Sequence, residues 1–217
     1  MDLAPEEDLD EAAFSKTYGL SRTPVREIFQ RLAGEGYVDI RENRGARAAP
    51  LTHATLRSFF LTAPMIYAAI GRLAVQNFRP QQLKNLTTTQ RRFRKASESG
   101  DVLSMVMDNN RFHEIMGEMS SNAYLQPCLT RLLIDHARIG HTFYQPRNDD
   151  MRRRIHLAVE QHDAFIEAIR ARDETAVVDL VFDHWELSRE NMEIYVIPDE
   201  MAADFAGDTA NKKQWRS

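Results

Sequence analysis

Apolar residues recur with a helical period throughout the chain after residue 52, whereas the first fifty residues mix short helical runs with glycines and a strand-like alternation. The later part predicts six or seven helices packed as a bundle, over residues 53–77, 80–97, 101–119, 122–143, 149–171 and 174–195. Residues 198–217 have no sustained period and are expected to form a flexible tail. The pattern therefore predicts a mainly α protein with an N-terminal domain over residues 1–51 and an all-helical domain over residues 52–197.

The N-terminal pattern predicts two short helices joined by a turn. They cover residues 11–18 and 22–33, with Ser21 as the N-cap of the second helix. The inward stripe of that second helix is predicted to contain Val25, Ile28, Phe29 and Leu32. Its opposite face is polar and basic, with outward positions at Arg22, Thr23, Arg26 and Gln30. The two helices therefore form a helix-turn-helix.

A hairpin is predicted after the second helix. Residues 37–41 alternate like a half-buried strand, and a turn containing Gly45 leads into a short run over residues 46–49. Three arginines lie near the tip of this hairpin, at Arg41, Arg44 and Arg47. One arginine-bearing helix is usually only a solvated face, but a basic second helix next to a basic hairpin suits guanine edges and phosphates. These features together favour a winged helix-turn-helix that binds duplex DNA.

The motifs of this region are LSRTPVRE over residues 20–27, followed by Arg31-Leu32 and Glu35-Gly36-Tyr37-Val38. They resemble the GntR family of bacterial transcription regulators. The resemblance implies that operator DNA is contacted by Arg22, Thr23, Arg26 and Gly45. That family has a further helix ahead of this segment, and the sequence as given starts beyond it, so the predicted winged helix lacks its first helix.

Polar side chains interrupt the apolar stripes of three helices in the second region. Asn109 and His113 lie one turn apart on the third helix of the predicted bundle, His162 lies on the fifth, and His184 on the sixth. A single histidine on an apolar face is usually a hydrogen-bonded core residue. Three inward histidines without partners would cost about 1 to 3 kcal/mol each, so they favour a shared ligand. A divalent transition metal would serve as that ligand, because neutral imidazole binds zinc, nickel and copper and Asn109 would add an oxygen.

This region also resembles the FCD domain of the FadR branch of the GntR family. The motifs are Asn109-x-x-Phe112-His113, then Glu160-Gln161-His162 with AIRARD over residues 168–173, and His184 preceding Ser188-Arg189. The resemblance implies that a metal, most often zinc or nickel, is bound by Asn109, His113, His162 and His184. It further implies that a small organic acid completes the coordination as effector, and that a homodimer reads a palindromic operator. Asparagine in place of an aspartate predicts weaker metal binding.

One wall of the implied effector pocket departs from the family. Where the family has an arginine and, four residues later, a glutamate, this sequence has Ala63 and Tyr67 beside Pro64. On the fourth helix of the bundle, His136 lies in the apolar stripe and Arg138 is suited to pair with an acid group, although a structural role stays open for both. The candidate effector contacts are therefore Tyr67, His136 and Arg138. Surface or helix-end positions are expected for His53, His141 and His156.

Composition bears on the location of the protein. With 217 residues, 43% of them hydrophobic, the chain suffices for two domains with separate cores. No apolar run approaches the roughly 18 residues of a membrane span, and the acidic N-terminal segment does not resemble a signal peptide, so a cytoplasmic protein without membrane contact is expected. The single cysteine, Cys128, is expected to be buried among leucines. The net charge of −4 leaves DNA binding open, because a sequence-specific binder needs only a local basic face.

These patterns predict a ligand-responsive transcription repressor that is not an enzyme. Two alternatives stay open. Three histidines around a metal also suit a metal-dependent hydrolase, although no HExxH pairing occurs and neither Glu114 nor Glu160 has the spacing of a general base. An effector sensor without DNA binding would follow if the missing first helix abolished operator recognition. In the regulator, the effector signal is expected to pass through the connection around residues 50–60.

Overall fold

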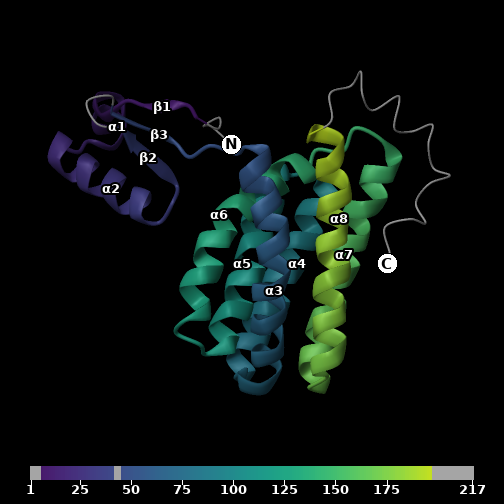
Figure 1. Ribbon diagram of the computed structural model, residues 1–217. Helices are drawn as coiled ribbons and strands as arrows, with labels where there is room; N and C mark the ends of the chain where they lie inside the picture. Colours follow the sequence, from purple (N-terminus) through teal and green to yellow (C-terminus); the bar gives the residue numbers. More distant parts are fainter. Residues whose placement is uncertain (1–5, 42–44, 197–217) are drawn as a thin grey trace.

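The structure is a computed structural model that describes residues 6–41 and 45–196. The predicted tail and the turn residues Asn43 and Arg44 lie outside these ranges. Figure 1 shows a small N-terminal unit of short helices and strands beside one end of a bundle of long helices. The mainly α fold predicted from the sequence is confirmed.

The N-terminal unit contains two helices and a small antiparallel sheet. Its elements are β1 (Asp8–Leu9), α1 (Glu11–Tyr18), α2 (Arg22–Gly34), β2 (Val38–Arg41) and β3 (Gly45–Ala48). The helix-turn-helix and the hairpin of the wing match the sequence pattern. The strand β1 was not predicted, because two residues are too few to show a period, and it pairs with β3 so that the sheet order is β1-β3-β2. Among residues 6–41, β1 is the element that precedes α1.

The core of this unit is small, and one predicted core residue lies outside it. Val25 and Phe29 are buried against the sheet residues Leu9, Val38 and Ala46. Ile28 was predicted to face inward, but 45% of it is exposed. At 100° per residue it lies at the edge of the stripe that Val25 and Phe29 define, outside the small core of this unit.

Six helices form the bundle in the described part of the chain. They are α3 (His53–Asn77), α4 (Pro80–Ser99), α5 (Val102–Ser120), α6 (Leu125–Phe143), α7 (Asp149–Ala171) and α8 (Glu174–Val196). Their order and approximate bounds agree with the prediction. The start of α6 is three residues later than expected, because the Asn122 side chain accepts hydrogen bonds from the main-chain amides of Tyr124 and Leu125 and holds a turn there.

The first helix of the bundle, α3, packs against α5, α6, α7 and α8. Thr52 and Thr55 form a capping box at its start. By length and hydropathy α3 alone among the described helices would suffice to cross a membrane. Part of its apolar surface packs inside the bundle, where Ala63, Ile70 and Ala74 are completely or almost completely buried.

The single cysteine differs from its prediction. Cys128 is exposed on α6, where its thiol contacts the carbonyl oxygen of Tyr124. Leu129 and Leu133 occupy the inward face of this helix, and Cys128 precedes Leu129 by 100° of helical rotation. The expectation of a buried cysteine was therefore wrong.

Candidate metal centre and nucleic-acid interface

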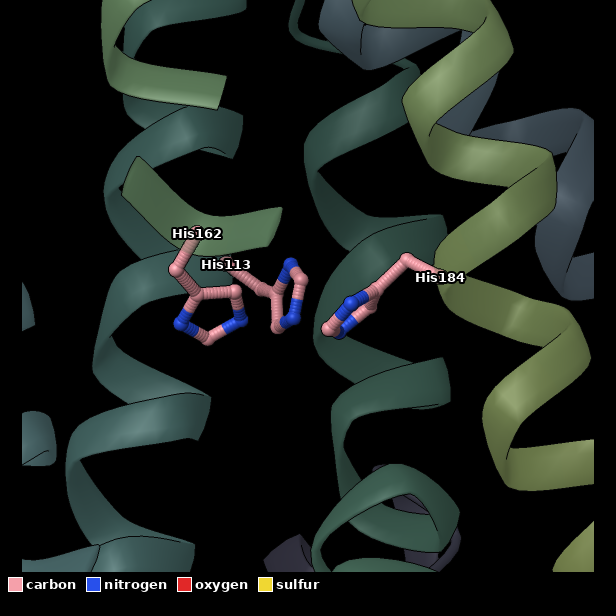
Figure 2. A group of neighbouring side chains, drawn as sticks. All are labelled: His113, His162 and His184. Atoms are coloured by element: carbon pink, nitrogen blue, oxygen red, sulfur yellow. The ribbon is translucent and has the colours of Figure 1, made fainter. Parts of the chain in front are cut away.

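Three buried histidines from three helices meet inside the bundle. His113 comes from α5, His162 from α7 and His184 from α8, and one ring nitrogen of each lies within 4.8 Å of the others. Figure 2 shows the His113 ring between the other two, with nitrogen atoms directed toward a common space. This spacing suits shared coordination of one metal ion, for which each Nε or Nδ atom would lie about 2 Å from the centre.

The hydrogen bonding of this cluster is incomplete. Both ring nitrogens of His113, Nε2 of His162 and Oδ1 of Asn109 are buried and have no hydrogen-bond partner within the described structure. Asn109 precedes His113 by one turn of α5 and is 1% exposed. Each unsatisfied buried polar group costs about 1–3 kcal/mol, so four such atoms in one place favour binding of a ligand or of water. The donor set of nitrogens and one amide oxygen fits a divalent transition metal.

A glutamine fixes which nitrogen of His162 is available. The Gln90 side chain donates from Nε2 to the carbonyl oxygen of Val159 at 2.8 Å, so its Oε1 faces His162. Since Oε1 can only accept, Nδ1 of His162 must carry the proton and donate at 3.1 Å. The lone pair therefore lies on Nε2, which is the nitrogen without a partner.

The other outer histidine has a similar arrangement. Nδ1 of His184 lies 2.8 Å from Oε1 of Gln161 and donates to it when Nδ1 carries the proton. Metal-binding histidines commonly donate their second N–H to such an oxygen, which orients the ring. Neither Gln90 nor Gln161 was singled out from the sequence. Their signal was weak, since Gln90 is a buried amide on an otherwise polar helix and Gln161 is only the neighbour of His162.

Burial keeps the cluster uncharged. It lowers the pKa of His113 and His162 well below the usual value, and neighbouring histidines lower these pKa values further. Burial lowers the pKa of His184 to about 4. Neutral imidazole is the form that binds a metal, so the cluster needs no deprotonation at pH 7 before it can coordinate one.

Two of the three predicted effector contacts lie beside this cluster. Nδ1 of His136 lies 2.8 Å from the hydroxyl of Tyr67, and Nε2 lies 3.4 Å from Nδ2 of Asn109. Because the Asn109 amide can only donate from Nδ2, His136 accepts there and donates from Nδ1 to Tyr67. The hydroxyl of Tyr67 then keeps its own proton for another acceptor. The ring of His136 is 4.8 Å from that of His113, centroid to centroid.

The third candidate, Arg138, lies elsewhere. Its guanidinium donates to the main-chain carbonyl oxygens of Ala49 at 2.7 Å and Pro50 at 3.3 Å, in the connection between β3 and α3. It also pairs with Asp135 at 3.4 Å. Two residues along α6 rotate the side chain by 200°, so Arg138 faces the N-terminal unit when His136 faces the histidines. Its placement is that of a link between the two units.

The predicted DNA contacts lie on α2 and at the start of β3. Arg22 and Thr23 are exposed in the first turn of α2, where the Ser21 side chain makes no capping hydrogen bond. Arg26 and Gly45 line a shared hollow of about 390 Å³ between α2 and the wing, together with Gln30 and Arg41. Gly45 has a φ of +78°, which favours glycine.

Three arginines of this unit form ion pairs, and one of these pairs joins Arg31 of α2 to Glu35 at 3.0 Å. Arg26 pairs with Glu11 at 2.8 Å but remains largely exposed. Arg47, expected near the tip of the wing, lies instead in the sheet, where it pairs with Glu6 at 2.8 Å and Asp39 at 3.5 Å. Arg44 lies outside the described residues. The basic side chains that line the hollow between α2 and the wing are Arg26 and Arg41.

The fold and these surfaces define a DNA-binding transcription regulator with an additional helical domain. Residues 1–47 match the gntR family of bacterial regulatory proteins, and residues 65–187 match the FCD domain. The chain belongs to the GntR family, in its FadR branch with an FCD domain. This family consists of DNA-binding regulators and not of enzymes, which sets aside the metal-dependent hydrolase.

Curated relatives and a solved structure agree with this assignment. The chain is 21% identical to the uncharacterised regulator YdhC of Bacillus subtilis, over 87% of this chain and 82% of that protein. It is 23% identical to the transcriptional repressor RspR of Escherichia coli, over 88% of this chain and 81% of RspR. The structure of Escherichia coli McbR/YncC has the same fold, with a TM-score of 0.75, 22% identity and 88% of each chain covered.

Proposed function

We propose that this protein is a cytoplasmic repressor whose operator binding is controlled by a small organic acid bound at a metal centre in the helical domain. The observation that carries this proposal is the set of buried, unpartnered ligand atoms on His113, His162 and Asn109, joined by His184. Such a set is too costly to keep empty in a protein core. The similarity to RspR, which is named a transcriptional repressor, supports repression as the effect of operator binding.

The metal site is assigned to Asn109, His113, His162 and His184. Zinc and nickel are the preferred occupants, because three imidazoles and one amide oxygen form a borderline donor set. A cation held by these residues would offer a carboxylate an open coordination position. The neutral amide of Asn109 leaves the site without a compensating carboxylate, so an acidic effector contributes charge that the protein itself does not supply.

The effector site is assigned to the space next to the metal ligands. Tyr67 is 4% exposed, and its hydroxyl has a proton to donate when His136 donates to it. A carboxylate oxygen is the natural acceptor for that proton. Burial raises the pKa of Tyr67 and lowers that of His136 to about 3, so both groups are neutral at pH 7 and neither repels the anion.

Coupling to DNA is assigned to α6. One face of this helix carries His136 toward the metal centre, and the other carries Arg138 to the carbonyl oxygens of Ala49 and Pro50. An effector that displaces His136 would therefore shift the anchor of the connection that leads to the wing. To act in this way it must bind one arrangement of the two units more tightly than the other.

DNA binding is assigned to Arg22, Thr23, Arg26 and Gly45. The uncapped amides at the start of α2 suit a phosphate, and arginine suits guanine edges. The palindromic operator expected for the family requires two copies of the winged helix. A homodimer through α3 is supported by Leu61 and Met65, which are 65% and 68% exposed one turn apart on that helix.

Selection of binding sites from a random duplex library with the purified protein tests the proposal. The expected result is a palindrome whose affinity falls steeply with salt and falls at least tenfold in Arg26→Ala. The matched control is Arg91→Ala, on the exposed face of α4. The affinity of the protein for the recovered operator is then measured with and without added zinc and a panel of hydroxy and keto acids. Absence of any enriched sequence at low salt would leave an effector sensor without DNA binding.

A further inference from the structure

A cavity of about 760 Å³ lies at one end of the bundle, apart from the histidine centre. It is formed where α4 and α6 end and where α5 and α7 begin. Because successive helices of the bundle are antiparallel, this is also the end at which α3 leaves the N-terminal unit, as Figure 1 shows. The start of α5 and the start of α7 both border the cavity, and helix N-termini favour negative charge.

The walls of this cavity combine cationic groups with an apolar surface. The cationic side chains are those of Arg147 and Arg152. His141 and His156, two of the histidines left without a role by the sequence, line the cavity as well, and burial lowers the pKa of His141. Val102, Met105 and Ile155 supply the apolar part. The described lining residues contain no aspartate or glutamate. Arg152 pairs with Asp149 at 3.6 Å, and the Asp149 side chain is largely in solvent.

Tyr144 adds a polar side chain to the wall of this cavity. It is 3% exposed and lines the cavity, yet its hydroxyl forms no hydrogen bond with another residue of the described structure. Burial raises the pKa of this hydroxyl, so it remains a proton donor. A hydroxyl in this position can donate a hydrogen bond to an acceptor in the cavity.

The cavity is separate from the metal centre. Ile155 of its wall and His162 of the centre are seven residues apart on α7, which corresponds to about 10 Å along the helix axis. The ring of Phe93 lies between them, with its centroid 5.6 Å from the ring of Tyr144 and 4.9 Å from that of His162. Phe93 is completely buried, so it forms a packed partition.

We propose that this cavity is a second ligand site, selective for organic anions in which a carboxylate or phosphate is attached to an apolar body. The anion would accept a hydrogen bond from Tyr144 and pair with Arg152, while its body would contact Met105 and Ile155. This site does not depend on metal binding or on operator recognition, and it is available in the protein stripped of metal.

Binding of fluorinated probes, followed by fluorine NMR on the full chain after treatment with EDTA, tests this assignment. The probes are 4-fluorobenzoate and 4-fluorophenyl phosphate, with neutral 4-fluorobenzamide as the uncharged counterpart. We expect at least one anion to bind metal-free protein and the amide to bind at least tenfold more weakly. Tyr144→Phe removes one hydrogen bond to a charged group and should lower the affinity for the anion about tenfold. Arg152→Gln should lower this affinity as well.

Matched variants separate this site from general effects on the surface. Tyr124→Phe changes a tyrosine that is 88% exposed, and Arg153→Gln changes an arginine adjacent to Arg152 that pairs with Asp150 and does not line the cavity. Both should bind the probe like the unchanged protein. Loss of anion binding on EDTA treatment would place the probe at the histidine centre and overturn the proposal. Equal binding of the amide, or full binding by both Tyr144→Phe and Arg152→Gln, would overturn it too.

Discussion

Gln90 is predicted to control metal affinity without touching the metal. Its Nε2 is committed to the carbonyl oxygen of Val159 and to Asp163, so its Oε1 must accept the proton of Nδ1 of His162. In Gln90→Leu the side chain keeps nearly the same volume but loses this acceptor. His162 is then free to rotate or to place its proton on Nε2, the nitrogen that must be bare for coordination.

The size of the effect follows from this single hydrogen bond. Loss of such a partner of a metal-binding histidine typically lowers metal affinity about 10- to 100-fold. At a fixed saturating zinc concentration, the stabilisation that zinc adds to the folded protein should therefore fall by about 1.4 to 2.7 kcal/mol. The free energy of unfolding of the metal-free protein also changes, because Gln90 is 2% exposed and its replacement alters the core.

The assay compares zinc affinity, measured by competition with a chelator, and denaturant unfolding with and without zinc. Only the difference between the zinc-bound and metal-free states enters the comparison, so a general loss of stability does not count as an effect on the site. Gln81→Leu, an exposed position on the same helix, is the control and should bind zinc normally. Unchanged zinc affinity in Gln90→Leu would refute the assignment of the proton on His162.

Three further predictions concern packing, coupling and DNA binding. In Gly71→Ala the new Cβ would lie 2.6 Å from the buried Val177, so urea unfolding should show a loss of about 1–3 kcal/mol; an unchanged midpoint would contradict this. Arg138→Ala should leave zinc affinity intact but reduce the effector-dependent change in operator affinity, which a retained full response would disprove. Glu11→Gln removes an exposed pair with Arg26 worth about 0.2–1 kcal/mol, so operator affinity in a mobility-shift assay should rise by up to about fivefold rather than fall.

Much of the candidate centre was accessible from the sequence because helical periodicity reports which face of a helix a residue occupies. Asn109, His113, His162 and His184 were each predicted to face inward, and each is buried. Periodicity is less informative at the edge of a stripe and on helices with several apolar faces. For this reason Ile28 and Cys128 were predicted to be buried and are exposed.

Helical periodicity did not predict which residue of another element a side chain contacts. Arg138 was a candidate for the effector pocket because it follows His136 closely in sequence, yet it reaches the connection at Ala49 and Pro50. Gln90 was overlooked because its role depends on Val159 and His162, which lie about seventy residues away. Such partners become visible only when the order and axial level of the helices are known.

The sequence by itself determined the helices, their inward faces, the helix-turn-helix with its wing and the types of ligand atom in the core. These features depend on local periodicity, capping and turn residues, which act over a few positions. The tertiary structure decided that three of the inward histidines lie within 4.8 Å of one another, that β1 completes the sheet, and that Tyr144 and two arginines border a second cavity. Those outcomes depend on which helices pack together and on their axial offset. Both are set by the complementary shapes of whole helix surfaces rather than by any local pattern.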